Sequence, residues 1–314
     1  PATFTAQTGT AGSNGHGSFS IDTAGTWTYT MNSAHDEFVA GQTYTDSVTV
    51  ATADGTSQLI TVTITGTNDA AVLSADVRDL IETDAALAAS GTLIISDVDS
   101  PATFVAQSGT TGAYGTFAID AAGAWTYSAT SAHDEFVAGV TYTDTFTVTS
   151  ADGTTTSVTI NILGTNDAAI VSSAYVSLSE TDALLTTGGT LTSDDVDNPD
   201  NVFVAASTVG AIGGFAIDAA GAWTFTANSA FDHLAVGQSA SEIFHVASID
   251  GTPSTVTVTI AGTNDAPVAV ADTRSGAEDT TITGTVATND GDIDDGSVLT
   301  YALNAAVAGL TINA

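Results

Sequence analysis

"TYTDTFTVTS", residues 141–150, alternates between two kinds of side chain along its whole length. One face is threonine-rich, and the other carries Tyr142, Asp144, Phe146 and Val148. Alternation of this kind is typical of a β-strand with one face in a core and the other in solvent. The stretch therefore predicts an antiparallel strand whose aromatic and aliphatic side chains are buried.

Neighbouring stretches follow the same rule. "SVTINIL" (157–163) places three aliphatic side chains on one face, and "GTFAID" and "AWTYS" pair Phe117 with Ile119 and Trp125 with Tyr127. The aliphatic positions of the first stretch are Val158, Ile160 and Ile162. About seven short strands in roughly a hundred residues, separated by Gly, Asp and Asn, are typical of an immunoglobulin-like sandwich. We therefore predict an all-β chain of antiparallel β-sandwiches, with Phe146, Val148 and the aromatic pair in the core.

The whole pattern returns every 98 residues. "GTNDA" begins at residues 66, 164 and 262, and the same interval separates Trp27, Trp125 and Trp223. Solenoid repeats are about 20–50 residues long, so this period indicates a domain. Each tryptophan lies on an alternating stretch, which predicts that all three belong to cores.

The "GTNDA" linkers divide the chain into four segments. Residues 70–167 and 168–265 are complete repeats, 1–69 lacks the first strands of a repeat, and 266–314 starts a further repeat that could be of another subtype. The two partial segments together exceed one repeat, so completing one with the other from a neighbouring molecule would duplicate a strand. The simpler interpretation is a section of a longer linear array.

The composition is strongly acidic, with 36 acidic residues against 2 basic ones and a formal net charge of −34. Such a surface repels nucleic acid and anionic membranes and attracts divalent cations. The chain has no cysteine, and no run of eighteen apolar residues is available to span a membrane. No signal peptide is visible, but residue 1 falls inside a repeat, so this absence is uninformative about export. Adaptation to high salt is an alternative explanation of the charge.

Acidic residues recur at fixed positions of the repeat. Successive turns of a sandwich lie at opposite ends, so we expect one group of carboxylates beside the preceding linker and another beside the following one. In 70–167 the first group is Asp97, Asp99 and Asp152, and the second is Glu82, Asp134 and Glu135. Carboxylates gathered from two domains repel one another, and a hard dication with six to eight oxygen ligands relieves that repulsion.

Four stretches together resemble the cadherin-like domains. They are "FAIDAAGAWTYSATSAHDEF" (117–136), "TFTVTSADG" (145–153), "GTNDA" and "DVD". At the family level they are similar to the VCBS and bacterial cadherin-like repeats of large RTX-type surface adhesins. The likeness extends over nearly the whole chain. It implies Ca²⁺ bound between successive domains.

The resemblance implies one ligand set at each linker. Around residues 68–69 the set is Asp36, Glu37, Asn68, Asp69, Asp97, Asp99 and Asp152. Around 166–167 it is Glu82, Asp134, Glu135, Asn166, Asp167, Asp195, Asp197 and Asp250. Around 264–265 it is Glu180, Asp232, Asn264, Asp265, Asp292 and Asp294.

The linker departs from the family's Asp-X-Asn-Asp-Asn pattern at both ends. Glycine replaces its leading aspartate and alanine replaces its final asparagine, which indicates one or two ions per junction rather than three. "DGDIDD" (290–295) also breaks the register of "DVD". Taken singly, Asp-Gly is a good hairpin turn and Asn-Asp a good loop. The coincidence of five acidic segments at every boundary favours calcium.

Nothing in the sequence favours an enzyme. His35 and His133 precede an aspartate, but Phe231 stands at that position in the third repeat. There is no cysteine nucleophile and no GxSxG or HExxH motif. Two carboxylates would suffice for a glycosidase, but near-identical tandem domains rarely each carry an active site.

The resemblance implies a calcium-rigidified extracellular spacer of a bacterial surface adhesin, exported by type I secretion and acting in adhesion or biofilm. The alternatives are a self-assembling filament, sheath or surface-layer protein, and calcium-dependent glycan-binding repeats. The expected partners are calcium and neighbouring repeats, with further copies or surface glycans under the alternatives. Nucleic acid and membrane insertion are not expected.

Overall fold

The computed structural model describes residues 3–312, and its strands, β1 to β23, all lie between residues 7 and 261. The described residues contain no helix, and so no helix long and apolar enough to cross a membrane. The chain divides into two compact units between Thr165 and Asn166. The prediction of an all-β chain of tandem sandwiches is confirmed.

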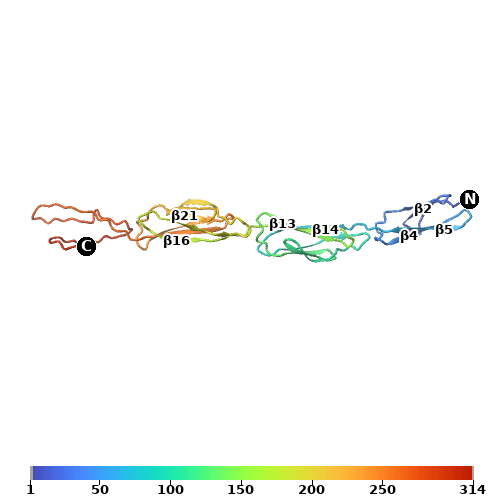
Figure 1. The fold of residues 1–314 in the computed structure, drawn as a ribbon, viewed down its shortest axis with the longest axis horizontal. Helices are drawn as coiled ribbons and strands as arrows, with labels where there is room; N and C mark the ends of the chain where they lie inside the picture. The colour runs from blue at the N-terminus through green and yellow to red at the C-terminus, as the bar shows by residue number, and fades with distance from the viewer. Residues whose placement is uncertain (1–2, 313–314) are drawn as a thin grey trace. The chain divides into compact units, whose positions relative to one another are not determined.

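Residues 72–163 of the first unit form a two-layer sandwich. One layer has the strand order β10–β11–β12–β8 and the other β13–β14–β7, and a short ribbon pairs β6 with β9. Figure 1 shows β13 and β14 in this sandwich. The bounds are β6 (Val72–Leu73), β7 (Asp76–Ile81), β8 (Ala88–Thr92), β9 (Ile95–Ser96), β10 (Gln107–Thr111), β11 (Gly115–Ile119), β12 (Ala124–Ala129), β13 (Thr141–Thr149) and β14 (Thr155–Leu163).

One strand pair departs from the antiparallel arrangement that the sequence predicts. β7 lies parallel to β14, with Asp76 opposite Val158 and Ile81 opposite Leu163. Both strands run from the end near the preceding linker toward the following one, so they can only pair in parallel. This pairing brings the residues after β7 beside the residues after β14.

The predicted core of this sandwich is confirmed. Trp125, Tyr127, Phe146, Val148 and Ile160 are each at most 3% exposed. β11 and β12 form a hairpin that places Phe117 opposite Tyr127. Alternation along the strands therefore identified the buried face correctly.

Residues 170–261 of the second unit repeat this topology. The layers are β17–β21–β20–β19 and β16–β23–β22, with the ribbon β15–β18, and β16 is parallel to β23. Trp223 is 3% exposed in this core. The bounds are β15 (Ile170–Val171), β16 (Ala174–Ser179), β17 (Thr186–Thr190), β18 (Ser193–Asp194), β19 (Ala206–Val209), β20 (Gly213–Ile217), β21 (Ala222–Ala227), β22 (Ser239–Ala247) and β23 (Pro253–Ala261).

Residues 3–65 form only part of a sandwich, with the sheets β1–β2–β3 and β4–β5. The bounds are β1 (Gln7–Ala11), β2 (Gly17–Ile21), β3 (Trp27–Met31), β4 (Thr43–Ala51) and β5 (Ser57–Thr65). The prediction that Trp27 is buried is wrong, because its side chain is 44% exposed. In the next sandwich β8 covers the equivalent indole by pairing Gly91 with Trp125. Residues 3–65 contain no such strand, so Trp27 lies on an open sheet edge.

The described residues after β23 form no named strand. Val268 and Gly291 make an isolated antiparallel bridge. The backbone N–H of Asp295 donates to the carbonyl of His233 over 2.8 Å. This contact places the acidic segment 292–295 against a loop of the preceding sandwich.

Candidate metal sites

Three carboxylates meet at the end of the second unit's sandwich. Glu180, Asp182 and Asp265 each offer an oxygen, and these oxygens lie within 4.8 Å of one another. Glu180 is 2% exposed, and its Oε2 accepts hydrogen bonds of 2.9 Å from both the N–H and the hydroxyl of Thr263. Its Oε1 and the Oδ2 of Asp265 are buried and have no hydrogen-bond partner among the described residues. The cluster therefore holds acceptor oxygens that lack donors.

The parallel strand pair builds this site. Glu180 directly follows β16, and Thr263 lies two residues beyond the end of β23. Because Ser179 is opposite Ala261 in the register, Glu180 reaches the linker as soon as both strands end. Asp265 then follows Thr263 by two residues.

Two further carboxylates complete the cluster around Asp265. Asp294 accepts the backbone N–H of Asp265 over 3.1 Å, and Asp232 lies in the loop between β21 and β22. Each has one buried oxygen without a partner in the described chain. Burial raises the pKa of Asp265, and the charges of Glu180, Asp182, Asp294 and Asp232 raise it further. Like charges in one place oppose ionisation, and a bound cation reverses that effect.

The other expected residues at this linker take supporting positions. Asn264 donates from its Nδ2 to the carbonyl of Asp265 over 2.8 Å, and Asp292 accepts the N–H of Asp294 over 3.1 Å. Asp182 is absent from the predicted ligand set. The sequence could have predicted this residue, since "SETD" (179–182) places an aspartate two residues after Glu180 in the same turn.

The linker at 68–69 carries a second acidic cluster inside the first unit. Burial raises the pKa of Asp69, followed by the charges of Asp36, Asp99 and Asp97. Asp97 Oδ1 accepts the N–H groups of Asp99 and Ser100 over 3.1 and 2.9 Å. The other oxygen of Asp97 and both oxygens of Asp99 are buried without a partner in the described residues. The structure therefore brings together aspartates from the segment before the linker, the linker itself and the domain after it.

Asp152 has a different environment. Its carboxylate accepts the N–H of Ala71 over 3.0 Å, the Nδ2 of Asn68 over 3.3 Å and the hydroxyl of Thr154 over 2.6 Å, and it also accepts the hydroxyl of Ser150. The Ser150 and Thr154 hydroxyls hold the pKa of Asp152 well below its usual range. Asp152 therefore anchors the linker with an already saturated carboxylate.

Asp250 occupies the equivalent position in the second unit. Burial would raise its pKa, but hydroxyl bonds from Ser248 and Thr252, with the N–H of Ala169 at 3.1 Å, bring it well below the usual range. Asp250 thus anchors Ala169 as Asp152 anchors Asn68 and Ala71.

The remaining expected residues are those named around 166–167, and they fall in both units. In the first unit Glu82, 1% exposed, accepts the N–H of Thr165 over 3.1 Å, and Glu82 Oε1 and Asp134 Oδ1 are buried without a partner in the described chain. In the second unit Asn166 donates to the carbonyl of Asp167 over 3.0 Å. There, burial and the neighbouring Asp197 raise the pKa of Asp195.

Glu37 and Glu135 each contact the histidine of their own loop through one carboxylate oxygen. Glu37 Oε1 lies 2.8 Å from His35 Nδ1, and Glu135 Oε1 lies 2.8 Å from His133 Nδ1. Their side chains are 64% and 62% exposed. These contacts tie each glutamate to the residue two positions before it.

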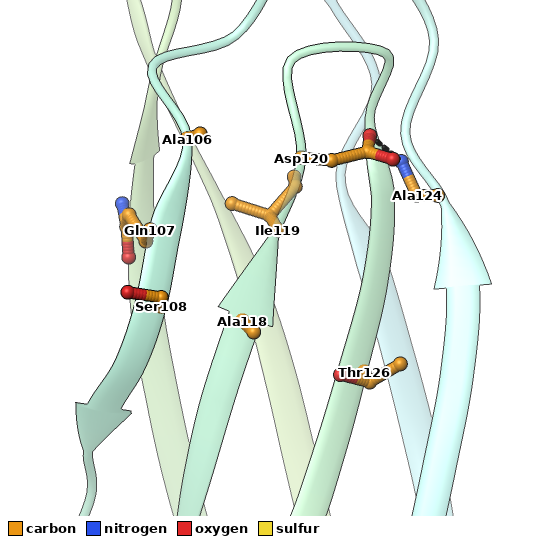
Figure 2. Close-up of a pocket in the computed structure, with 8 residues that line it drawn as sticks. All are labelled: Ala106, Gln107, Ser108, Ala118, Ile119, Asp120, Ala124 and Thr126. Atoms are coloured by element: carbon orange, nitrogen blue, oxygen red, sulfur yellow. Dashed lines mark hydrogen bonds between the residues drawn. The ribbon is translucent and has the colours of Figure 1, made fainter.

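A shallow depression of about 360 Å³ lies on β10, β11 and β12, where Figure 2 shows it lined mainly by small side chains. Its polar groups are already engaged. Asp120 Oδ1 accepts the N–H groups of Ala122 and Ala124 over 2.9 Å, and Gln107 Nε2 donates to the carbonyl of Thr147. The depression gathers no acid and base around a reacting atom, so we assign no chemistry to it.

Comparison with protein-family models finds two tandem matches to the bacterial cadherin-like domain in the chain. The model of the bacterial cadherin-like domain matches residues 68–164 and again residues 166–262. None of the curated proteins compared with the chain matches it in sequence.

Among solved structures, protocadherin gammaB7 EC3-6 in a cis dimer is 15% identical, with a TM-score of 0.45, covering 87% of this chain and 68% of that one. The protocadherin GammaB4 extracellular domain is 16% identical, with a TM-score of 0.45 and coverages of 87% and 46%. Drosophila N-cadherin EC1-4 is 15% identical, with a TM-score of 0.29 and coverages of 84% and 67%. This chain thus spans less than half of the GammaB4 structure.

Proposed function

Because this chain belongs to the family of bacterial cadherin-like domains, we propose that it binds calcium at its linkers and works as a spacer. The parent protein on this proposal is a large bacterial surface adhesin with VCBS or RTX-type features, exported by type I secretion. The repeats hold other parts of that protein away from the cell in adhesion or biofilm. The proposal assigns no catalytic role, since the histidines of the linker loops are engaged by glutamate and backbone oxygens.

The cluster of Glu180, Asp182 and Asp265 is the observation that carries this proposal. All three side chains offer carboxylate oxygen, which suits hard cations and not the softer metals that prefer nitrogen or sulfur. The chain has no lysine and only Arg78 and Arg274 as permanent cations, so its own side chains supply little counter-charge. Calcium takes six to eight oxygen ligands in flexible geometry, which suits a site assembled from turns and a linker.

Calcium at such a site would stiffen the linker, because the ligands come from different segments of the chain. Glu180 and Asp232 belong to one sandwich, Asp265 to the linker and Asp294 to the segment that follows. An ion that binds all four holds the linker against both of its neighbours. Without the ion the same carboxylates repel one another.

Calorimetric titration of the full chain tests the binding. We expect calcium to bind with dissociation constants on the order of 10⁻⁴–10⁻³ M and magnesium to bind more weakly, because magnesium demands stricter octahedral geometry. We also expect a smaller maximum dimension in small-angle scattering after chelation, together with a lower melting temperature. Equal dimensions and equal melting with and without calcium would contradict the proposal and favour a salt-adapted surface instead.

A further inference from the structure

A residue with positive φ stands directly before the aspartate in each linker-facing loop. The three residues are His35 before Asp36 (φ 60°), His133 before Asp134 (φ 68°) and Phe231 before Asp232 (φ 67°). Residues other than glycine adopt the left-handed region rarely, because their Cβ crowds the backbone there. Other contacts must therefore hold these loops in place.

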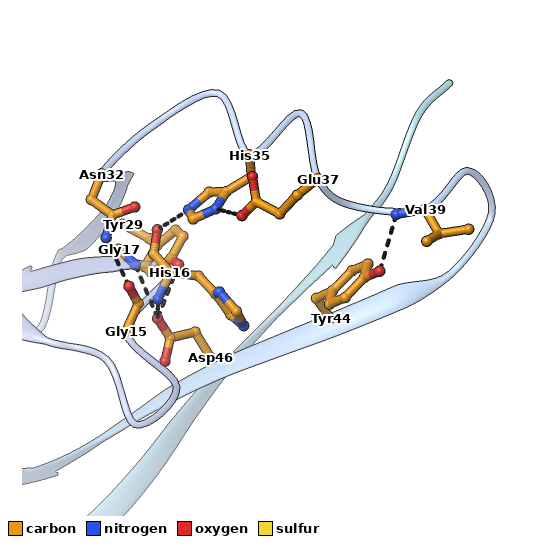
Figure 3. A network of polar contacts seen from close by, with 10 residues as sticks. All are labelled: Gly15, His16, Gly17, Tyr29, Asn32, His35, Glu37, Val39, Tyr44 and Asp46. Carbon is orange, nitrogen blue, oxygen red and sulfur yellow. Dashed lines mark hydrogen bonds and ion pairs between the residues drawn. The ribbon is translucent and has the colours of Figure 1, made fainter. Parts of the chain in front are cut away.

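The His35 ring is held at both of its nitrogens, as Figure 3 shows. Nε2 lies 2.8 Å from the carbonyl oxygen of His16, and Nδ1 lies 2.8 Å from Glu37 Oε1. Carbonyl and carboxylate oxygens only accept hydrogen bonds, so both ring nitrogens donate. The ring thus joins the loop of Asp36 to the β1–β2 turn.

An aromatic stack supports the same loop. The His35 ring stacks on Phe38 with centroids 4.5 Å apart, and Phe38 stacks on Tyr44 at 3.8 Å. The Tyr44 hydroxyl accepts the N–H of Val39 over 3.0 Å. Residues on both sides of Asp36 are therefore held against β4 through the Tyr44 side chain.

The β1–β2 turn is itself tied to the core. Asp46, which is fully buried, accepts the N–H groups of Asn14, His16 and Gly17 over 2.9, 3.1 and 3.1 Å. Asp46 therefore holds the β1–β2 turn, and the turn holds His35 through the His16 carbonyl. Asp36 is the next residue in the chain after His35.

The second repeat has the same connections. Asp144 accepts the N–H of Tyr114 over 3.1 Å, and the Tyr114 carbonyl lies 2.8 Å from His133 Nε2. His133 stacks on Phe136 with centroids 4.5 Å apart.

The third repeat lacks one connection. Glu242 accepts the N–H groups of Ala211 and Ile212 over 3.0 Å, so the turn remains tied to the core. Phe231 has no ring nitrogen and cannot donate to the Ile212 carbonyl. The left-handed backbone is nevertheless present, which makes the chain its own control for a histidine-to-phenylalanine change.

We propose that His35 and His133 are positioning residues for the calcium sites, holding Asp36 and Asp134 in the orientation in which they bind the ion. The inference rests on the proposed calcium binding. Without the histidine, the loop must be ordered when calcium binds, and that ordering lowers the affinity. In the third repeat Phe231 is 8% exposed and belongs to the hydrophobic core, so packing takes the place of the two ring hydrogen bonds.

The test compares wild type with H35F in the full chain. His245, an exposed residue on β22, provides the matched control H245F. Calcium is titrated into ¹⁵N-labelled protein, and amide resonances of residues 66–69 and 263–265 report the two linkers separately. Losing the two ring hydrogen bonds should raise the midpoint at 66–69 about threefold to tenfold. The midpoint at 263–265 should stay unchanged, and H245F should change neither.

Other outcomes would contradict either the proposed function or the positioning role of His35. If neither region of the wild type responds to calcium, the proposed function itself fails. If the wild type responds and H35F has the same midpoint at 66–69, the positioning role is wrong. A shift at both linkers would show a general structural role and would also overturn the inference.

Discussion

Asp265→Asn should change the stability of the second unit in opposite directions with and without calcium. In the folded chain, burial and four neighbouring carboxylates raise the pKa of Asp265. A carboxyl whose folded pKa lies above its unfolded value loses stability as pH rises through the folded pKa, so the unfavourable contribution is fully present at neutral pH. The neutral amide removes this contribution. In chelator the variant should therefore unfold at a higher temperature than wild type.

In calcium the sign reverses, because Asp265 is then one of the ligands. With a dissociation constant on the order of 10⁻⁴–10⁻³ M and about 10 mM calcium, binding adds about 1.4–2.7 kcal/mol per site. An amide still offers one oxygen but no charge, and the five-carboxylate cluster becomes a four-carboxylate one. The variant should lose most of the calcium-dependent stabilisation at this linker.

Hydrogen exchange of peptides from β23 measures this effect locally, because the full chain has several cores that unfold separately. Asp200→Asn removes the same charge from an exposed position of the same sandwich and should shift exchange little in either condition. If Asp265→Asn is destabilising in both conditions, Asp265 is a structural residue and repulsion in the cluster is unimportant. If it is neutral in calcium, Asp265 is not a ligand.

Three further changes test the fold. Trp125→Ala should lower the free energy of unfolding of the sandwich of β7–β14 by about 3–5 kcal/mol. Trp27→Ala should lower that of its own segment by about 1–2 kcal/mol, because Trp27 is 44% exposed. Equal losses, measured by local hydrogen exchange, would contradict the position of Trp27 at a sheet edge. Gly91→Ala should cost about 1–3 kcal/mol, since an added Cβ would lie 2.8 Å from the Trp125 ring, and an unchanged thermal unfolding would contradict this packing. Asp152→Asn should lower the melting temperature at neutral pH. The difference from wild type should stay nearly constant down to about pH 4 and shrink progressively below it, because the depressed pKa of Asp152 gives stability that is lost only as pH falls from the unfolded pKa toward the folded one; a difference that stays constant down to about pH 2 would argue against it.

The fold was largely predictable because one face of each strand is buried. Period-two alternation identified Phe146 and Val148 as core, and the 98-residue interval carried this assignment to the next repeat. The exposure of Trp27 was not predictable from its own strand, because burial of the indole depends on the strand that pairs with it. The parallel pairing of β7 with β14 was missed for a related reason, since alternation reveals the face of a strand but not its neighbour.

The candidate sites were predictable to the level of segments. Around residues 264–265 the linker, the Glu-Thr-Asp turn, the Asp-X-Asp segment and the loop of Asp232 do meet, because parallel pairing ends β16 and β23 at one place. Individual roles were less accessible. Glu37 is occupied by His35, an interaction between residues two positions apart that depends on a left-handed backbone. No periodicity in the sequence encodes that conformation.

The aspartates of a linker divide into two kinds according to their donors, and this division bears on how calcium could act. Asp152 follows Ser150 and precedes Thr154, whose hydroxyls reach its carboxylate, and it also binds the linker N–H of Ala71. Asp99 has no donor among the described residues for either oxygen. The bonds of Asp152 need no metal, so the linker stays attached to the domain that follows it in the absence of calcium. The charges of Asp36, Asp99 and Asp97 all raise the pKa of Asp69, so carboxylates from both sides of the linker act on it. Backbone hydrogen bonds of Gly66 with Gly41 and Gln42 hold the start of the linker to the segment before it. Calcium would therefore add a connection between Asp36 and the aspartates after the linker, and removing it should loosen that contact while both ends of the linker stay attached.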